Sequence, residues 1–342
     1  MCCYITGYGA ALPDCVVTNA ELAPLLGVTP DWIEAHSGIG ERRWVEAHRA
    51  TSDLAVAAVR DALNDADTSA EQVDYLIGCT LSPDYQVPGV APIVQRKLDG
   101  CRNIPAIDLR AGCAAILYGL QLARSLIESD TAHTIVCFGA EAQSKGLDLQ
   151  PRSADLSMLF GDGAGAVVLS RESKPTDKDR DCLVRIDDII IETDGRFAED
   201  LIVRAPGTAN GARWLDEEHL AAGLHYGSME GRSVILQAVR KIADAAVCIT
   251  ERNGISLDEI DVVIPHQANA NLLRSLAKKL SIREERVVSN LERFGNTSSA
   301  SAFLALWQAR REHRLHAGSY ALILAFAAGF TWGSALCRVC ND

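Results

Sequence analysis

Three side chains in this sequence, those of Cys113, His266 and Asn296, stand in settings where they could do covalent chemistry. Cys113 follows the small-residue turn Ala111–Gly112 and opens a helical pattern, where peptide dipoles and free N–H groups favour a thiolate. Such a sulfur could accept an acyl group and form a covalent intermediate. The alternative is a buried structural cysteine, which behaves as a small apolar side chain.

His266 and Asn296 offer hydrogen-bonding groups that acyl chemistry at a thiol would use. His266 follows the apolar run "VVIP". As a neutral imidazole it could donate to a thioester carbonyl, or it could pair with the thiolate. Its alternative is a core histidine with satisfied hydrogen bonds. Asn296, in "RFGNTSSAS", offers an amide donor, or it caps a helix, where asparagine is a favoured residue.

Short apolar runs alternate along the chain with amphipathic stretches, which predicts an α/β protein whose sheets are covered on both faces. The expected strands are "VDYLIGCT", "IPAIDL", "HTIVCFGA" and "AGAVVLS", and the expected helices include "TSDLAVAAVRDALNDA" and "AAILYGLQLARSLIES". The glycines of "FGDGAGAVVLS" precede a strand rather than a helix. They therefore indicate a tight turn and not a dinucleotide site.

The second half of the sequence repeats the pattern of the first at a near-constant separation. "DYLIGCTLSP" resembles "DVVIPHQANA", and "HTIVCFGA" resembles "YALILAFA". This predicts two related halves packed face to face, residues 1–172 and 183–342, joined by the polar segment 172–182. The alignment makes Cys113 and Asn296 equivalent. Because ligand sites lie beyond the carboxyl ends of strands, the two halves should bring Cys113, His266 and Asn296 to one crevice.

Composition excludes several classes of function. A net charge of −12 argues against nucleic acid and anionic membranes as partners. The sequence has no uninterrupted apolar run long enough for a transmembrane helix and no signal-peptide pattern at its start. Eleven scattered cysteines favour a reducing cytoplasm. The single CxxC, Cys337 to Cys340, has no second pair, so we expect no metal site.

Five motifs taken in order, "GCAAILYGL", "GDGAGAVVLS", "VIPHQANA", "RFGNTSSAS" and "GFTWGSAL", resemble the β-ketoacyl-acyl-carrier-protein synthase III family. The resemblance runs nearly end to end. It implies the thiolase fold, with two pseudo-symmetric halves in αβαβα layers, a homodimer, and no permanently bound cofactor. Within the family, "TLSPDYQVP" and "IDLRAGCAAILYGLQLAR" are similar to the 2-aminobenzoylacetyl-CoA synthases.

The resemblance also implies a reaction, the decarboxylative Claisen condensation of fatty acid or secondary-metabolite (polyketide or quinolone-like) biosynthesis. Cys113 would take an acyl group from coenzyme A, and His266 and Asn296 would hold the carbonyl of a malonyl thioester as CO₂ leaves. The N–H groups of Cys113 and Ala328 would form the oxyanion hole. Phe326 matches the family's aromatic residue near the thiol.

Further residues match the family's substrate contacts. Val87 lies in the segment that shapes the acyl pocket at the dimer interface, and its small size would admit a bulkier starter. The matches to coenzyme A contacts are Trp32, Arg152, Gly231, Asn269 and Thr29.

Other positions depart from the family's pattern. His36 and Gly40 replace arginines, which removes two charges that could meet coenzyme A phosphates. Asn271 and Leu236 stand where the family has basic residues that dock the acyl carrier protein. Their lack of charge weakens this docking surface and would allow malonyl-CoA as the extender. The expected helix that follows Asn271 still carries three basic residues, Arg274, Lys278 and Lys279.

Two other functions stay open. Cys113 could pass its acyl group to a hydroxyl or an amine without condensation. Alternatively, the chain could be a non-catalytic partner subunit, although such a subunit would be expected to lose the thiol or its partners.

Overall fold

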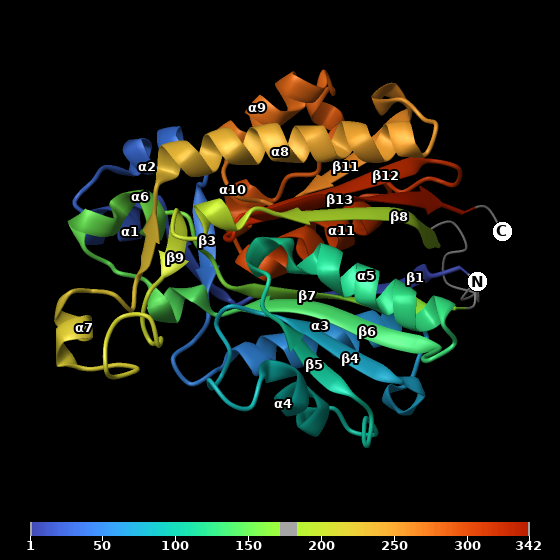
Figure 1. Cartoon of the computed structure of the whole chain (residues 1–342), viewed down its shortest axis with the longest axis horizontal. Coiled ribbons are helices and arrows are strands. Elements are labelled where there is room, and N and C mark those ends of the chain that lie inside the picture. The colour runs from blue at the N-terminus through green and yellow to red at the C-terminus, as the bar shows by residue number, and fades with distance from the viewer. Residues whose placement is uncertain (1, 172–182, 341–342) are drawn as a thin grey trace.

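The computed structural model describes residues 2–171 and 183–340, so the predicted crossover, 172–182, lies outside the described residues. Nine strands form a hydrogen-bonded series in the order β11-β12-β13-β8-β1-β7-β6-β4-β5. β1 and β8 share two residue pairs, Tyr4 with Arg185 and Ile5 with Val184. The series therefore folds into two sheets, one above the other (Figure 1). The first sheet comprises β1 (Tyr4–Ala11), β7 (Gly163–Ser170), β6 (Thr134–Glu141), β4 (Tyr75–Cys79) and β5 (Ala106–Leu109). The second comprises β8 (Val184–Thr193), β13 (Thr331–Val339), β12 (Tyr320–Ala327) and β11 (Ile260–Pro265).

The two sheets share one connectivity. β1 pairs with β7 and β7 with β6 antiparallel, whereas β6 and β4 are parallel. β8, β13, β12 and β11 repeat this series of directions. The predicted pair of related halves is therefore confirmed, while the exact bounds 1–172 and 183–342 stay a prediction.

Helices cover both faces of both sheets. β6 and β12 are buried at seven of their eight positions each, and such strands need cover on either side. Between the sheets lie α5 (Ala115–Glu128) and α11 (Ser301–Arg311). The outer layers are α3 (Thr51–Asp65) and α4 (Val90–Lys97) on one side, and α8 (Gly231–Arg252) and α9 (Ala270–Leu280) on the other (Figure 1). The predicted α/β class and five-layer arrangement are confirmed.

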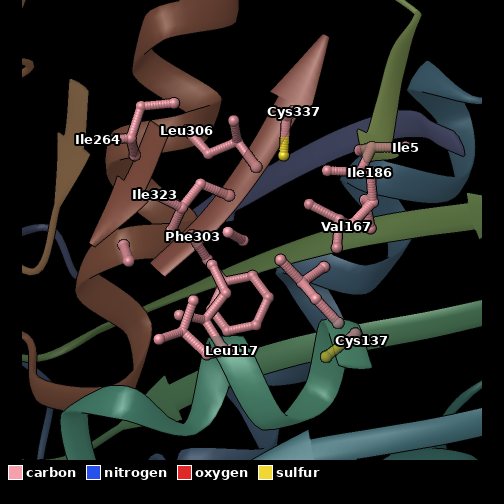
Figure 2. Close-up of a cluster of buried hydrophobic side chains, with 14 of the residues drawn as sticks. Ile5, Leu117, Cys137, Val167, Ile186, Ile264, Phe303, Leu306, Ile323 and Cys337 are labelled. Carbon is pink, nitrogen blue, oxygen red and sulfur yellow. The ribbon is translucent and has the colours of Figure 1, made fainter. Parts of the chain in front are cut away.

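The core between the sheets takes apolar side chains from both halves. Figure 2 shows Phe303 of α11 and Leu117 of α5 in one buried cluster with Val167 of one sheet and Ile323 of the other. Gly165 of β7 allows α11 to approach closely, because a Cβ there would lie 2.6 Å from the Cβ of Phe303. This packing fixes the start of α11 against both sheets.

Shorter elements surround this frame. They are β2 (Cys15–Thr18), α1 (Asn19–Leu26), α2 (Pro30–Ser37), β3 (Glu41–Trp44), α6 (Ala154–Ser157), β9 (Leu201–Val203), α7 (Glu217–Ala221), β10 (Gly227–Met229) and α10 (Leu291–Phe294). None of the described helices is long and apolar enough to cross a membrane. The ten cysteines within the described residues are all free thiols.

The two central helices begin with matching short 3₁₀ turns, η2 (Gly112–Ala114) before α5 and η9 (Ser298–Ala300) before α11. Each turn starts at a positive φ, 53° at Gly112 and 48° at Ser298. Cys113 therefore corresponds to Ser299, and the predicted equivalence with Asn296 is wrong by three residues. The sequence alignment matched Gly112 with Gly295, the glycine before Asn296. In the structure, however, Ser298 takes the left-handed position that Gly112 has in η2.

Candidate active site

Cys113 lies in η2, against the turn that follows β12. A Cβ on Gly112 would lie 3.1 Å from the Cβ of Ala327, the last residue of β12. Cys113 is half-buried, and its Sγ lies 3.6 Å from Oγ of Ser298. The residues that form this contact are far apart in the sequence, and the contact joins η2 to η9.

The Cys113 thiol is protonated in this environment. Burial raises its pKa to about 12, and the hydrogen bond with Ser298 offsets only part of this rise. The expectation that the helix start would favour a thiolate is therefore wrong for the free protein. The cost of removing a charged sulfur from water exceeds the gain from the hydrogen bonds that favour the thiolate.

His266 directly follows β11 and is almost fully buried, at 7% exposure. Its backbone N–H donates to the carbonyl of Leu324, and its Nδ1 lies 2.5 Å from Oγ of Ser301, the first residue of α11. Burial lowers the pKa of His266 to about 3, so the imidazole is neutral. Of the two predicted roles, the neutral hydrogen-bond donor fits this pKa and the pairing of a charged imidazolium with a thiolate does not.

Asn296 is held by backbone and side-chain hydrogen bonds. Its N–H donates to the carbonyl of Leu159 at 2.8 Å, and its own carbonyl accepts from the N–H of Gly161. Its side-chain Oδ1 accepts from the N–H of Ser298 at 2.9 Å. The Asn296 side chain thus binds the first residue of η9 from the position before the N-cap, which is Thr297 and not Asn296 as the capping alternative predicted. This contact orients Nδ2 as the remaining donor.

The donor atoms of His266 and Asn296 are accessible. Among the described residues, neither Nε2 of His266 nor Nδ2 of Asn296 has a hydrogen-bond partner, and neither is a fully buried unpaired atom. Cys113 and Asn296 both contact Ser298, and His266 contacts Ser301. The structure therefore brings all three predicted residues to the start of α11.

Sequence reasoning missed the serines that make these contacts, and it missed Glu141. The signal available for the serines was the run of small polar residues in "NTSSAS". Glu141 ends β6 and is fully buried; burial raises the pKa of its carboxyl group. It accepts hydrogen bonds from Ser82 Oγ, Ser299 Oγ and the N–H of Leu81. It thereby joins the loop after β4 to η9, and a lone acid at the end of an apolar strand was its signal.

The two N–H groups predicted for an oxyanion hole are free of carbonyl partners. Cys113 precedes α5, and Ala328 is a half-buried residue in the turn after β12. Neither N–H donates to a backbone carbonyl in the parts of the chain that the structure covers. Because Gly112 and Ala327 nearly touch, both groups belong to the same pair of abutting turns. Their joint role as an oxyanion hole stays a prediction.

The two predicted pocket residues, Phe326 and Val87, lie in different surroundings. Phe326 points to the outer face of β12, where its ring lies 4.8 Å from that of Phe330, whereas Cys113 packs with the central layer. Val87 is 85% exposed, and Tyr85 beside it is 64% exposed. Their roles in an acyl pocket stay predictions.

Several residues predicted to contact coenzyme A already bind other parts of the chain. Thr29 caps α2 through the N–H of Trp32. Arg152 pairs with Asp148 at 2.6 Å. Both polar ends of the Asn269 side chain are used, because Oδ1 accepts from the N–H of Asn271 and Nδ2 donates to the carbonyl of His36.

Trp32 and Gly231 are the other two predicted contacts. The Trp32 ring is half-buried and stacks on His36 with ring centroids 4.2 Å apart. Gly231 opens α8. None of the five contacts to coenzyme A is tested by this geometry. Within the described ranges, no group of three His, Cys, Asp or Glu residues could hold a metal ion.

Comparisons with known proteins give one consistent result. Two family models match, 3-oxoacyl-[acyl-carrier-protein (ACP)] synthase III over residues 107–183 and its C-terminal counterpart over residues 250–339. A β-ketoacyl-[acyl-carrier-protein] synthase III of Clostridium perfringens is 36% identical over 335 residues, 98% of this chain and 98% of that relative. One from Roseiflexus castenholzii is 37% identical over 98% of this chain and 97% of its own.

Solved structures agree with the sequence comparisons. The crystal structure of 3-oxoacyl-[acyl-carrier-protein] synthase III from Aquifex aeolicus superposes with a TM-score of 0.85 at 34% identity, covering 98% of this chain and 99% of that one. A priming β-ketosynthase from the R1128 polyketide biosynthetic pathway superposes with a TM-score of 0.84 at 28% identity, covering 99% and 96%.

Proposed function

Since this chain belongs to the 3-oxoacyl-[acyl-carrier-protein] synthase III family of condensing acyltransferases, we propose that it makes a β-keto thioester by decarboxylative Claisen condensation. Cys113 carries the starter acyl group, and His266 and Asn296 act on the malonyl thioester. The observation that carries this proposal is the convergence of all three residues on the first turn of α11 and the turn before it.

The first step is acylation of Cys113. Its sulfur forms a bond to the carbonyl carbon of an acyl-CoA, the bond from that carbon to the sulfur of coenzyme A breaks, and coenzyme A leaves as the thiol with the proton of Cys113. The N–H groups of Cys113 and Ala328 stabilise the negative oxygen of the tetrahedral intermediate. Because the resting thiol is protonated, removal of its proton is part of this step.

The second step uses the neutral His266. Ser301 Oγ already accepts from the N–H of Gln267, so we assign its hydroxyl proton as the donor to Nδ1. The ring proton then lies on Nε2, and it donates to the malonyl thioester carbonyl together with Nδ2 of Asn296. The malonyl carboxylate leaves as CO₂, and its electron pair forms the enolate that these two donors stabilise. The enolate carbon bonds to the acyl carbon and breaks the bond to Cys113, whose sulfur takes up one proton.

The substrates are proposed by analogy with the family. The starter is an acyl-CoA, and the malonyl group is carried by coenzyme A or by an acyl carrier protein. Docking of a carrier protein would use Arg274, Lys278 and Lys279 of α9, whereas Asn271 is uncharged and accepts a hydrogen bond from Arg274. The relatives that share over a third of this sequence are named β-ketoacyl-[acyl-carrier-protein] synthase III, and we therefore propose fatty acid biosynthesis ahead of a secondary pathway. No permanently bound cofactor is needed.

We also propose a cytoplasmic homodimer. β5 is an edge strand of its sheet. It carries Ile107, and the neighbouring loop carries Tyr85 and Val87, all of them exposed apolar side chains in one chain. A second copy pairing along this edge would bury them and could bring Val87 to the partner's acyl site.

The test combines intact-mass analysis with CO₂ release. The purified protein is treated with a panel of acyl-CoA thioesters, and an adduct that disappears in Cys113→Ala is expected. Label in the free carboxyl group of malonyl-CoA or malonyl-carrier protein should then appear as CO₂, dependent on His266 and Asn296. An adduct without CO₂ release from either malonyl donor would favour simple acyl transfer to a hydroxyl or an amine. The absence of any adduct would overturn the proposed enzyme activity and favour a non-catalytic subunit.

A further inference from the structure

Ser298 occupies an unusual position beside the thiol. It has a φ of 48°, in the left-handed region that side chains other than glycine seldom adopt, and it is 1% exposed. The matching residue in the first half is Gly112. A serine at a position whose backbone conformation suits glycine points to a use for its hydroxyl group.

The Ser298 hydroxyl contacts the nucleophile. Its Oγ lies 3.6 Å from Sγ of Cys113, within hydrogen-bonding range for sulfur, and no other side chain in the described residues forms a hydrogen bond with this thiol. A hydroxyl group can both accept and donate. It can therefore accept from the S–H of the resting thiol or donate to a thiolate.

The backbone of Ser298 contacts the second functional residue. Its N–H donates to Oδ1 of Asn296 at 2.9 Å, which leaves Nδ2 of Asn296 as the donor for substrate. This bond depends on the main chain and not on the serine side chain. The two contacts of Ser298 can therefore be separated by substitution.

We propose that Ser298 is a positioning residue that serves both half-reactions, through a hydroxyl that donates to the Cys113 sulfur as it becomes negative and a backbone N–H that holds the Asn296 amide. The proposal rests on the proposed function in taking Cys113 as the nucleophile. It adds a residue that assists ionisation of that nucleophile.

Neither of the nearby titratable groups stabilises a Cys113 thiolate, so the Ser298 hydroxyl is the side chain that can. The elements packed against η2 are η9, α5, β12 and β13. None of their titratable groups is among those that shift the pKa of the thiol; these groups are Tyr118, Arg124, Glu128, Tyr320, Cys337 and Arg338. Two further buried titratable groups of the site are Glu141 at the end of β6 and His266 after β11. The charge of Glu141 would oppose a thiolate. His266 is uncharged because burial holds its pKa at about 3. Hydrogen bonds to a charged group are the stronger ones, so a hydroxyl in contact with the sulfur favours the thiolate.

The test measures alkylation of Cys113 by iodoacetamide as a function of pH. Cleavage after Arg110 and Arg124 releases the peptide "AGCAAILYGLQLAR", which holds Cys113 as its single cysteine, so mass spectrometry follows this thiol alone. The variants are Ser298→Gly, which fits the positive φ, and Ser298→Ala. Thr297→Ala is the matched control, because it removes the neighbouring hydroxyl and Thr297 makes no hydrogen bond to the thiol in the described structure.

Both Ser298 variants should shift the alkylation profile about one unit to higher pH, which is about tenfold slower at a fixed pH below the midpoint. Thr297→Ala should leave the profile in place. Because both Ser298 variants keep the backbone N–H, the KM for the malonyl thioester should stay within about twofold of the unmodified protein.

Profiles that superpose on that of the unmodified protein would overturn the proposal, and so would an equal shift in Thr297→Ala. If both Ser298 variants failed to fold, as judged by circular dichroism, the residue would be required for the fold and the proposed role would fall. Alkylation needs no substrate, so this result is independent of whether the condensation is observed.

Discussion

The buried neutral histidine makes a quantitative prediction about acid stability. Burial moves the pKa of His266 from 6.5 to about 3 in the folded protein. His266 therefore becomes protonated near pH 6.5 in the unfolded chain but only near pH 3 in the folded chain. The stabilisation is fully present above pH 6.5 and is lost as the pH falls toward 3.

The loss approaches about 1.4 kcal/mol per pH unit within this window. Between pH 7 and pH 5 it amounts to about 2 kcal/mol from His266 alone. His266→Gln removes the titrating group, and its amide can still bond to Ser301 Oγ. We therefore expect the variant to lose about 2 kcal/mol less unfolding free energy than the unmodified protein over the same interval.

The assay is urea denaturation at pH 7 and pH 5, followed by circular dichroism. His316→Gln serves as the control, because it removes an exposed histidine and leaves the buried one in place. This control should show the full loss seen in the unmodified protein. An equal loss in His266→Gln and the unmodified protein would refute the assignment of His266 as a buried neutral donor.

Three further outcomes are expected. Gly112→Ala should lower the unfolding free energy by about 1–3 kcal/mol in urea denaturation, because it places a Cβ 3.1 Å from that of Ala327 at a positive φ; unchanged stability would contradict the close contact. Asn296→Ala should slow CO₂ release from malonyl thioester about 100-fold or more while intact mass still shows acylation of Cys113; equal losses in both steps would argue against a role confined to decarboxylation. Burial raises the pKa of Glu141, so its stabilisation is full at low pH and is lost as the pH rises through the raised pKa; urea denaturation of Glu141→Gln should lack this loss, and a dependence like that of the unmodified protein would refute it.

The sequence carried enough information for the architecture. Apolar periodicity distinguishes strands from helices locally, and the repeat of "DYLIGC" as "DVVIPH" predicts two related halves. The same local logic placed Cys113 before a helix and His266 after a strand. Both placements agree with the structure, because each depends on near neighbours in the chain.

The state of the site depended on contacts between distant residues. The approach of Ser298 to Cys113 exists only after two sheets and two central helices have packed. Burial then decides the charges, since desolvation leaves the thiol protonated and the imidazole neutral. The local patterns could not foresee that Asn269 would be occupied by the end of α2, or that Cys113 would match Ser299. Sequence periodicity therefore accounts for where the functional residues lie along the chain, and three-dimensional packing accounts for their protonation and their partners, because solvent exclusion depends on the whole fold.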